Sequence, residues 1–156
     1  MDLDLTQQVF SALERRGVRY AVFGAVALNI HGFVRATEGL DLFVAPDSEN
    51  IAALKEALSG VFEDPAIAEI SAEDLLGEYP AVQYVPPMGD FHLDILTRLG
   101  EAFRYADLEV ERVRFGSLEV SVVSPRTLYL MKRDTVRPKD RMDAEVLREM
   151  FKVQDP

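Results

Sequence analysis

The spacing of apolar side chains switches between a helical period of about 3.6 residues and a strand period of two, and the switches mark the expected elements. Helical spacing predicts amphipathic helices over residues 5–16, which Gly17 ends, and after the cap Pro46-Asp47-Ser48. The side chains expected to face the core are Val9, Phe10 and Leu13 in the first helix and Ile51, Leu54 and Leu58 in the second. A short helix over residues 72–77, capped by Ser71, is expected next.

Two more helices are expected near the C-terminus, one that starts at Ser124-Pro125 and one over about residues 140–151. Apolar or alternating runs predict strands over residues 20–23, 40–44, 81–85, 91–96, 108–114 and 118–123. Turn residues join the third strand to the fourth and the fifth to the sixth, so each pair is expected to form an antiparallel hairpin. Helices would then flank a mixed sheet, and the expected fold class is α/β.

Residues 24–41 combine a turn of small residues with an acidic residue inside a strand. The turn, Gly24-Ala25, ends the first strand, and a short helix from about Val26 to Gly32 is expected after it. Small residues let backbone N–H groups approach an anion without an intervening side chain. Asp41 stands in an apolar strand, where a carboxylate must find a partner or a metal ion. The pattern suggests a phosphate-handling site with a metal ion held by Asp41.

Strand alternation places Gly39 and Asp41 on one face of the second strand, and His92 and Asp94 on the corresponding face of the fourth. Two strands thus each carry an aspartate on the face away from the core. We predict that Asp41 and Asp94 lie close enough to share one divalent ion, facing the Gly24-Ala25 turn. The alternative is that these are two solvated strand faces.

At these residues the chain resembles the nucleotidyltransferase superfamily that includes DNA polymerase beta. The family pattern is a hydrophobic residue, Gly, then Gly or Ser, a spacer, and Asp-hydrophobic-Asp. The chain has Phe23-Gly24-Ala25, a spacer from Val26 to Glu38, and Gly39-Leu40-Asp41, so Ala25 and Gly39 depart from the pattern. The segment from Leu130 to Lys132 and the segment over residues 137–143 look like the C-terminal motifs of small bacterial AbiEii-type nucleotidyltransferases of toxin–antitoxin modules. The resemblance spans roughly residues 18–151.

The resemblance implies a single nucleotidyltransferase-like domain over residues 1–156, with Mg²⁺ as cofactor and a nucleoside triphosphate as substrate. A nucleoside monophosphate would pass to a hydroxyl of RNA, protein or a small molecule, by in-line displacement between divalent ions. Asp41 and Asp94 would be the catalytic metal ligands, and Gly24 and Ala25 would cradle phosphate. Lys132 and Arg137 would bind the triphosphate, Lys132 as a point charge and Arg137 as a fork.

Gly39 removes a ligand from one of the metal positions that the family pattern implies. Glu38 is adjacent, but strand alternation points it to the other face. An active enzyme and a catalytically silent nucleotide- or partner-binding module therefore both remain open, and a single-metal hydrolase using Asp41, His92 and Asp94 is a third reading. An aspartate introduced at position 39 is expected to point beside Asp41 at little cost and to raise activity.

Length and composition limit the classes of protein to which the chain can belong. The 156 residues suffice for one substantial core, and no apolar run approaches the roughly 18 residues of a membrane span. No membrane partner is therefore expected, and the absence of cysteine fits a cytoplasmic protein. A net charge of -10 argues against broad nucleic-acid binding, although residues 126–141 carry six Lys or Arg against two Asp. So small a chain leaves room for a homodimer or a protein or RNA partner to complete the site. His31 is expected to cap the last carbonyls of its helix.

Overall fold

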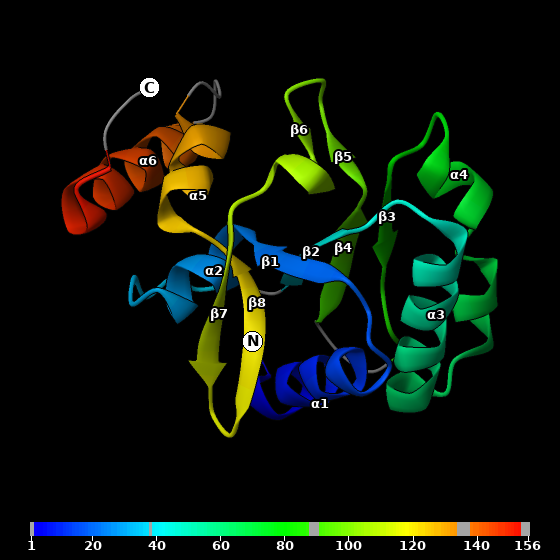
Figure 1. The fold of residues 1–156 in the computed structure, drawn as a ribbon. Helices are drawn as coiled ribbons and strands as arrows, with labels where there is room; N and C mark the ends of the chain where they lie inside the picture. The colour runs from blue at the N-terminus through cyan, green and yellow to red at the C-terminus, as the bar shows by residue number, and fades with distance from the viewer. Residues whose placement is uncertain (1, 38, 88–90, 134–137, 154–156) are drawn as a thin grey trace.

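A mixed sheet of six strands stands at the centre of the molecule, with the strand order β3-β4-β2-β1-β8-β7 (Figure 1). The computed structural model describes residues 2–37, 39–87, 91–133 and 138–153. The strands of this sheet are β1 (Tyr20–Phe23), β2 (Gly39–Val44), β3 (Ala81–Tyr84), β4 (His92–Leu96), β7 (Val110–Phe115) and β8 (Leu118–Val123). The helices are α1 (Leu3–Arg15), α2 (Gly24–Ile30), α3 (Ser48–Phe62), α4 (Ala72–Leu76), α5 (Pro125–Lys132) and α6 (Pro138–Phe151), with the 3-10 turns η1 (Pro65–Glu69) and η2 (Tyr105–Asp107). The α/β prediction is confirmed.

Strand pairing brings the two expected aspartates onto adjacent strands. β2 lies antiparallel to β1 and parallel to β4, and its register pairs Asp41 with Asp94 and Gly39 with His92. β3 pairs with β4 and β7 pairs with β8 as the two predicted antiparallel hairpins, although residues 88–90 of the first turn lie outside the described residues. β1 also runs parallel to β8.

Helix starts follow the capping residues that the sequence marks. The Asp47 side chain accepts a hydrogen bond from the Asn50 backbone N–H, and the Ser71 and Ser124 side chains cap α4 and α5 in the same way. The inward residues of α1 and α3 are fully buried, as predicted: Val9, Phe10, Leu13, Ile51, Leu54 and Leu58. α1 packs against α3, and α5 packs against α6 (Figure 1).

Two local predictions need correction at the helix that follows the first turn. α2 begins at Gly24 and ends at Ile30, earlier at both ends than expected. The His31 ring does not cap this helix, because its Nε2 lies 2.9 Å from the backbone oxygen of Val123 and its ring packs edge-on against Phe151. His31 therefore joins the end of α2 to β8 and α6, which is a structural role of a different kind.

A two-stranded ribbon, β5 (Arg98–Leu99) and β6 (Phe103–Arg104), follows β4 directly and was not predicted. Each strand has only two residues, too few to show an alternating pattern. In Figure 1 the ribbon projects above the sheet, as do α5 and α6. None of the helices in the described residues is long and apolar enough to cross a membrane.

Candidate active site

The turn between β1 and α2 lies directly against the carboxylate of Asp41. Gly24 has φ +68°, a left-handed conformation that glycine adopts without steric cost. A Cβ atom built at Gly24 would lie 2.0 Å from Oδ2 of Asp41, so no other residue fits without displacing this side chain. The Asp41 carboxylate thus lies close against the Gly24 backbone.

Asp41 and Asp94 face each other across the parallel pair of β2 and β4. Both residues are half-buried. Burial, the charge of Asp94 and a hydrogen bond with the Asp94 carboxyl group together raise the pKa of Asp41 to about 7, against the opposing charges of His92 and Lys132. Two carboxyl groups held this close repel each other when both are ionised, and a divalent cation between them would relieve that repulsion.

These residues open onto a cavity of about 520 Å³. Its wall includes the sequence-predicted site residues Gly24, Ala25, Asp41, Asp94 and Lys132. The other polar residues of the wall are Arg35, Thr37, Asp140 and Asp143, and the apolar ones are Phe23, Leu99, Leu128 and Met131. The structure therefore brings together five of the six residues predicted from the sequence, and Arg137 lies outside the described residues.

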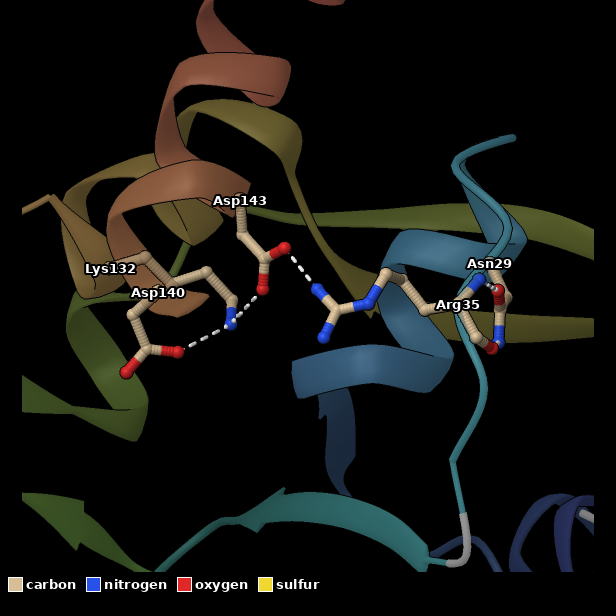
Figure 2. Close-up of polar contacts among 5 residues, drawn as sticks. All are labelled: Asn29, Arg35, Lys132, Asp140 and Asp143. Atoms are coloured by element: carbon tan, nitrogen blue, oxygen red, sulfur yellow. Dashed lines mark hydrogen bonds and ion pairs between the residues drawn. The ribbon is translucent and has the colours of Figure 1, made fainter. Parts of the chain in front are cut away.

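Lys132 lies at the centre of a network of ion pairs that spans three elements (Figure 2). Its Nζ is 3.1 Å from Oδ1 of Asp140 and 3.0 Å from Oδ2 of Asp143, both on α6. Arg35 donates to the other carboxylate oxygen of Asp143. The Asn29 side chain makes two hydrogen bonds to the Arg35 backbone. Oδ1 of Asn29 accepts from the N–H of Arg35, and Nδ2 of Asn29 donates to the carbonyl oxygen of Arg35. The network ties α5 and α6 to the segment between α2 and β2.

Sequence reasoning did not identify Arg35 as part of the site. Its partner Asp143 is 108 residues away in the chain, so no local spacing marks the pair. Asp140 and Asp143 belong to the C-terminal segment quoted for the family resemblance, but no role was assigned to them. A search for acidic residues spaced one helical turn apart would have marked them, because α6 places Asp140 and Asp143 on one face.

Position 39 differs from what the strand pattern suggested. A Cβ atom built at Gly39 would lie 2.4 Å from Nε2 of His92, and two carbons of the ring would lie 2.7 and 2.8 Å away. An aspartate fits here only if the imidazole, the far end of the His92 side chain, moves aside, and the low cost of this substitution stays a prediction. Alternation placed His92 on this face, but only the register between strands shows that it covers Gly39.

The donor set at the cavity fits a divalent cation with oxygen ligands. Mg²⁺ is commonly bound through one or two carboxylates, with water and substrate phosphates filling its other positions. Asp41 and Asp94 provide two such carboxylates side by side. Within the described ranges, no three His, Asp or Glu side chains are already arranged as a complete ligand set. Substrate oxygens would therefore have to supply part of the coordination shell.

The mixed sheet of six strands with flanking helices is a nucleotidyltransferase-like α/β fold. The chain belongs to the AbiEii family, whose model is described as "Nucleotidyl transferase AbiEii toxin, Type IV TA system" and matches residues 12–151. The resemblance inferred from the sequence is confirmed. The family description supports a nucleotidyltransferase activity and a place in a toxin–antitoxin system.

Solved structures with the same fold cover nearly the whole chain. TM1012 from Thermotoga maritima, described as a "putative nucleotidyltransferase", has a TM-score of 0.57 and 13% identity over 96% of this chain and 92% of its own. ANT(2")-Ia in complex with adenylyl-2"-tobramycin has a TM-score of 0.57 and 15% identity, over 96% and 88% of the two chains. The solution structure of ANT(2'')-Ia has a TM-score of 0.52 and 19% identity, over 96% of this chain and 90% of its own. No curated protein sequence matches the chain.

Proposed function

We propose that the cavity binds a nucleoside triphosphate with Mg²⁺ and that the protein transfers a nucleoside monophosphate from it to a hydroxyl acceptor. The observation that carries this proposal is the pair Asp41 and Asp94, held side by side against the Gly24 turn in one cavity. Asp41 and Asp94 bind the cation. Gly24 and Ala25 leave the backbone of the turn open to phosphate oxygens, because no long side chain covers it.

Lys132 and Arg137 are the proposed ligands of the triphosphate. Asp140 and Asp143 hold the Lys132 ammonium group at the cavity wall, which fixes its position before a substrate arrives. The apolar part of the wall, formed by Leu99, Leu128 and Met131, offers a surface for the nucleobase. Arg137 is assigned from the family resemblance alone.

The reaction exchanges a phosphoanhydride bond of the triphosphate for a phosphodiester bond to the acceptor, and pyrophosphate leaves. The acceptor oxygen forms a bond to the α-phosphorus, the bond to the pyrophosphate oxygen breaks, and the proton of the acceptor hydroxyl passes to solvent. A bound Mg²⁺ supplies charge stabilisation for the phosphoryl oxygens. The protein residues hold the triphosphate and the acceptor in line, and placement of this kind accounts for much of the rate of such reactions.

The acceptor is a hydroxyl of RNA, a protein or a small molecule. ANT(2")-Ia was solved with adenylyl-2"-tobramycin, so this fold accommodates a small acceptor in that protein. A homodimer or a protein partner would complete the acceptor side in this chain, which we propose to be one domain over residues 1–156. A cytoplasmic location, suggested by the absence of cysteine, would supply nucleoside triphosphates and Mg²⁺.

Calorimetry with each nucleoside triphosphate, with and without Mg²⁺, tests the binding step. We expect Mg²⁺-dependent binding in the wild type and its loss in Asp41→Asn and in Asp94→Asn. Asp74→Asn is a matched control, because Asp74 is exposed on α4 and does not line the cavity. Equal binding in all four proteins would contradict the proposal.

Mass spectrometry of candidate acceptors after incubation with the bound triphosphate tests the transfer step. A mass increase equal to one nucleoside monophosphate, absent in Asp41→Asn, supports the enzyme. Binding without transfer to any acceptor would instead favour the silent module, for which the missing carboxylate at Gly39 is the specific observation.

A further inference from the structure

The second strand lacks the side chain that would stand beside Asp41, and a side chain from the neighbouring strand occupies the space. Gly39 pairs with His92 in the parallel register of β2 and β4. The ring of His92 leans over Gly39 so closely that its Nε2 lies 2.4 Å from the point where a Cβ of residue 39 would be. The imidazole thus stands where a side chain at position 39 would begin.

The same nitrogen faces the carboxylate of Asp94. Nε2 of His92 lies 3.3 Å from Oδ2 of Asp94. Two ligand atoms on one metal ion, with bonds of about 2.0–2.1 Å at 90–109°, lie about 2.8–3.4 Å apart. The separation of the imidazole nitrogen and the carboxylate oxygen is therefore that of two neighbouring ligands in one coordination shell.

Asp94 also shares a hydrogen bond with the Asp41 side chain, and the strand register places His92, Asp94 and Asp41 on one face of the sheet. They do not surround a common point in the described structure. The side chain of His92 is 29% exposed, which leaves its ring free to rotate toward a cation between the two carboxylates. The movement required is a side-chain rotation and not a change in the backbone.

We propose that His92 takes the place of the carboxylate missing at Gly39, and that its imidazole nitrogen makes the cation site select Mn²⁺ over Mg²⁺. The inference rests on the proposed function, because it assigns the third ligand of the same site. Mg²⁺ is a hard ion that prefers oxygen ligands and dehydrates reluctantly. A site with one imidazole nitrogen and two carboxylates favours a transition metal, and Mn²⁺ accepts both kinds of ligand.

Electron paramagnetic resonance measures this selectivity without any catalytic turnover, because free Mn²⁺ gives a signal that decreases on binding. The affinity for Mg²⁺ follows from its competition with Mn²⁺. We expect the wild type to bind Mn²⁺ at least about tenfold more tightly than Mg²⁺. In His92→Ala the Mn²⁺ affinity should fall by about tenfold or more, within the range seen when groups around a metal site are altered, while the Mg²⁺ affinity changes little.

The double variant Gly39→Asp/His92→Ala tests the exchange of one ligand for the other. Removal of the ring frees the space for the new carboxylate, so this variant should bind Mg²⁺ more tightly than His92→Ala and should lose the preference for Mn²⁺. The single variant Gly39→Asp should gain less, because the aspartate and the imidazole compete for one space. His31→Gln is the control, since the ring of His31 contacts the Val123 backbone and not Asp94.

The outcomes separate the two proposals. A ratio of Mn²⁺ to Mg²⁺ affinity that is the same in the wild type and in His92→Ala overturns the role of His92 and leaves the proposed function standing. Failure of the wild type to bind either cation, alone or with a nucleoside triphosphate, overturns both proposals. Circular dichroism of each variant establishes that it is folded before its affinity is compared.

Discussion

Gly24 has a hydrogen atom where any other residue would have a carbon atom 2.0 Å from Oδ2 of Asp41. Two separate constraints act at this position, the left-handed backbone and the contact with the carboxylate. The sequence could predict the turn, because Gly-Ala follows an apolar strand. It could not predict the contact, which depends on how β2 lies against β1 in the folded sheet.

Replacement of Gly24 by alanine separates the two constraints when compared with Gly17→Ala. Gly17 has a similar φ of +64° but no neighbour within 4 Å of a built Cβ. Both variants should lose about 1–2 kcal/mol of unfolding free energy from the left-handed backbone, measured by urea denaturation. Only Gly24→Ala should also lose Mg²⁺-dependent binding of the triphosphate in calorimetry. Equal binding by both variants would mean that the turn does not position Asp41.

Gly39 marks the limit of what strand alternation can predict. Alternation assigned Asp41, Asp94 and His92 to one face of their strands, and the structure places all three there. The distance between side chains on different strands depends on register, which the sequence of a single strand does not specify. The sequence therefore could not show that an aspartate at position 39 has to displace the His92 ring.

At the scale of elements, α6 is connected to the rest of the site through Asp143. Its carboxylate pairs with both Lys132 and Arg35, and its side chain is only 4% exposed. An ion pair with so little solvent costs several kcal/mol to break, because removal of one partner leaves uncompensated buried charge. We therefore expect this network to stabilise the docking of α6 more than a single exposed ion pair would.

Asp143→Asn should therefore destabilise the protein by about 2–4 kcal/mol, measured by urea denaturation near neutral pH. Glu145→Gln is a matched control on the same helix, because Glu145 is exposed and lies 3.8 Å from Arg148. The control should change stability by no more than about 0.5 kcal/mol. A loss of similar size in both variants would show that the buried network does not hold α6 in place.

A second contact between elements links α1 to the hairpin of β7 and β8. Glu14 accepts hydrogen bonds from Arg112 and from the Tyr20 hydroxyl, and the bond from Arg112 is the main cause that lowers the pKa of Glu14. A carboxyl group with a lowered folded-state pKa stabilises the fold above its unfolded pKa, which is about 4.3–4.5. That stabilisation is lost as the pH falls through the folded-state value.

Glu14→Gln should accordingly be less stable than the wild type at pH 7, and the difference should shrink as the pH falls below about 4.5. Urea denaturation of both proteins across this range measures it. The exposed pair of Arg16 and Glu56 gives a control, since Glu56→Gln should change stability little at any pH. A difference that stays constant down to acid pH would show that the charge of Glu14 does not contribute.

Elements could be predicted better than their ends and connections. The helices α1, α3 and α5 follow an apolar stripe or a capping residue, and both signals are local. The β5–β6 ribbon, which places Leu99 in the cavity wall, is too short to show a period. His31 was assigned to its own helix, whereas its partner Val123 is 92 residues away. What the sequence could not predict depends in each case on a contact between distant segments.

At the scale of the whole molecule, the net charge of -10 opposes the charge of the proposed substrate. A nucleoside triphosphate with one Mg²⁺ remains an anion, so the long-range field of the protein repels it, while Lys132 attracts it only at short range. Salt screens the long-range part first, because the Debye length falls from about 30 Å at 0.01 M to about 8 Å at 0.15 M.

The association rate of the Mg²⁺-bound triphosphate should therefore rise as salt increases from about 0.01 M to about 0.15 M, measured by stopped-flow fluorescence with a labelled nucleotide. A double variant, Glu49→Gln/Glu73→Gln, removes two exposed acids outside the cavity wall and should reduce the slope of the rate against salt without altering the site. A rate that falls with salt in the wild type would show that the basic groups near the cavity dominate the approach. The sign of the slope thus decides whether the overall acidity of the chain or its local basic segment guides the substrate.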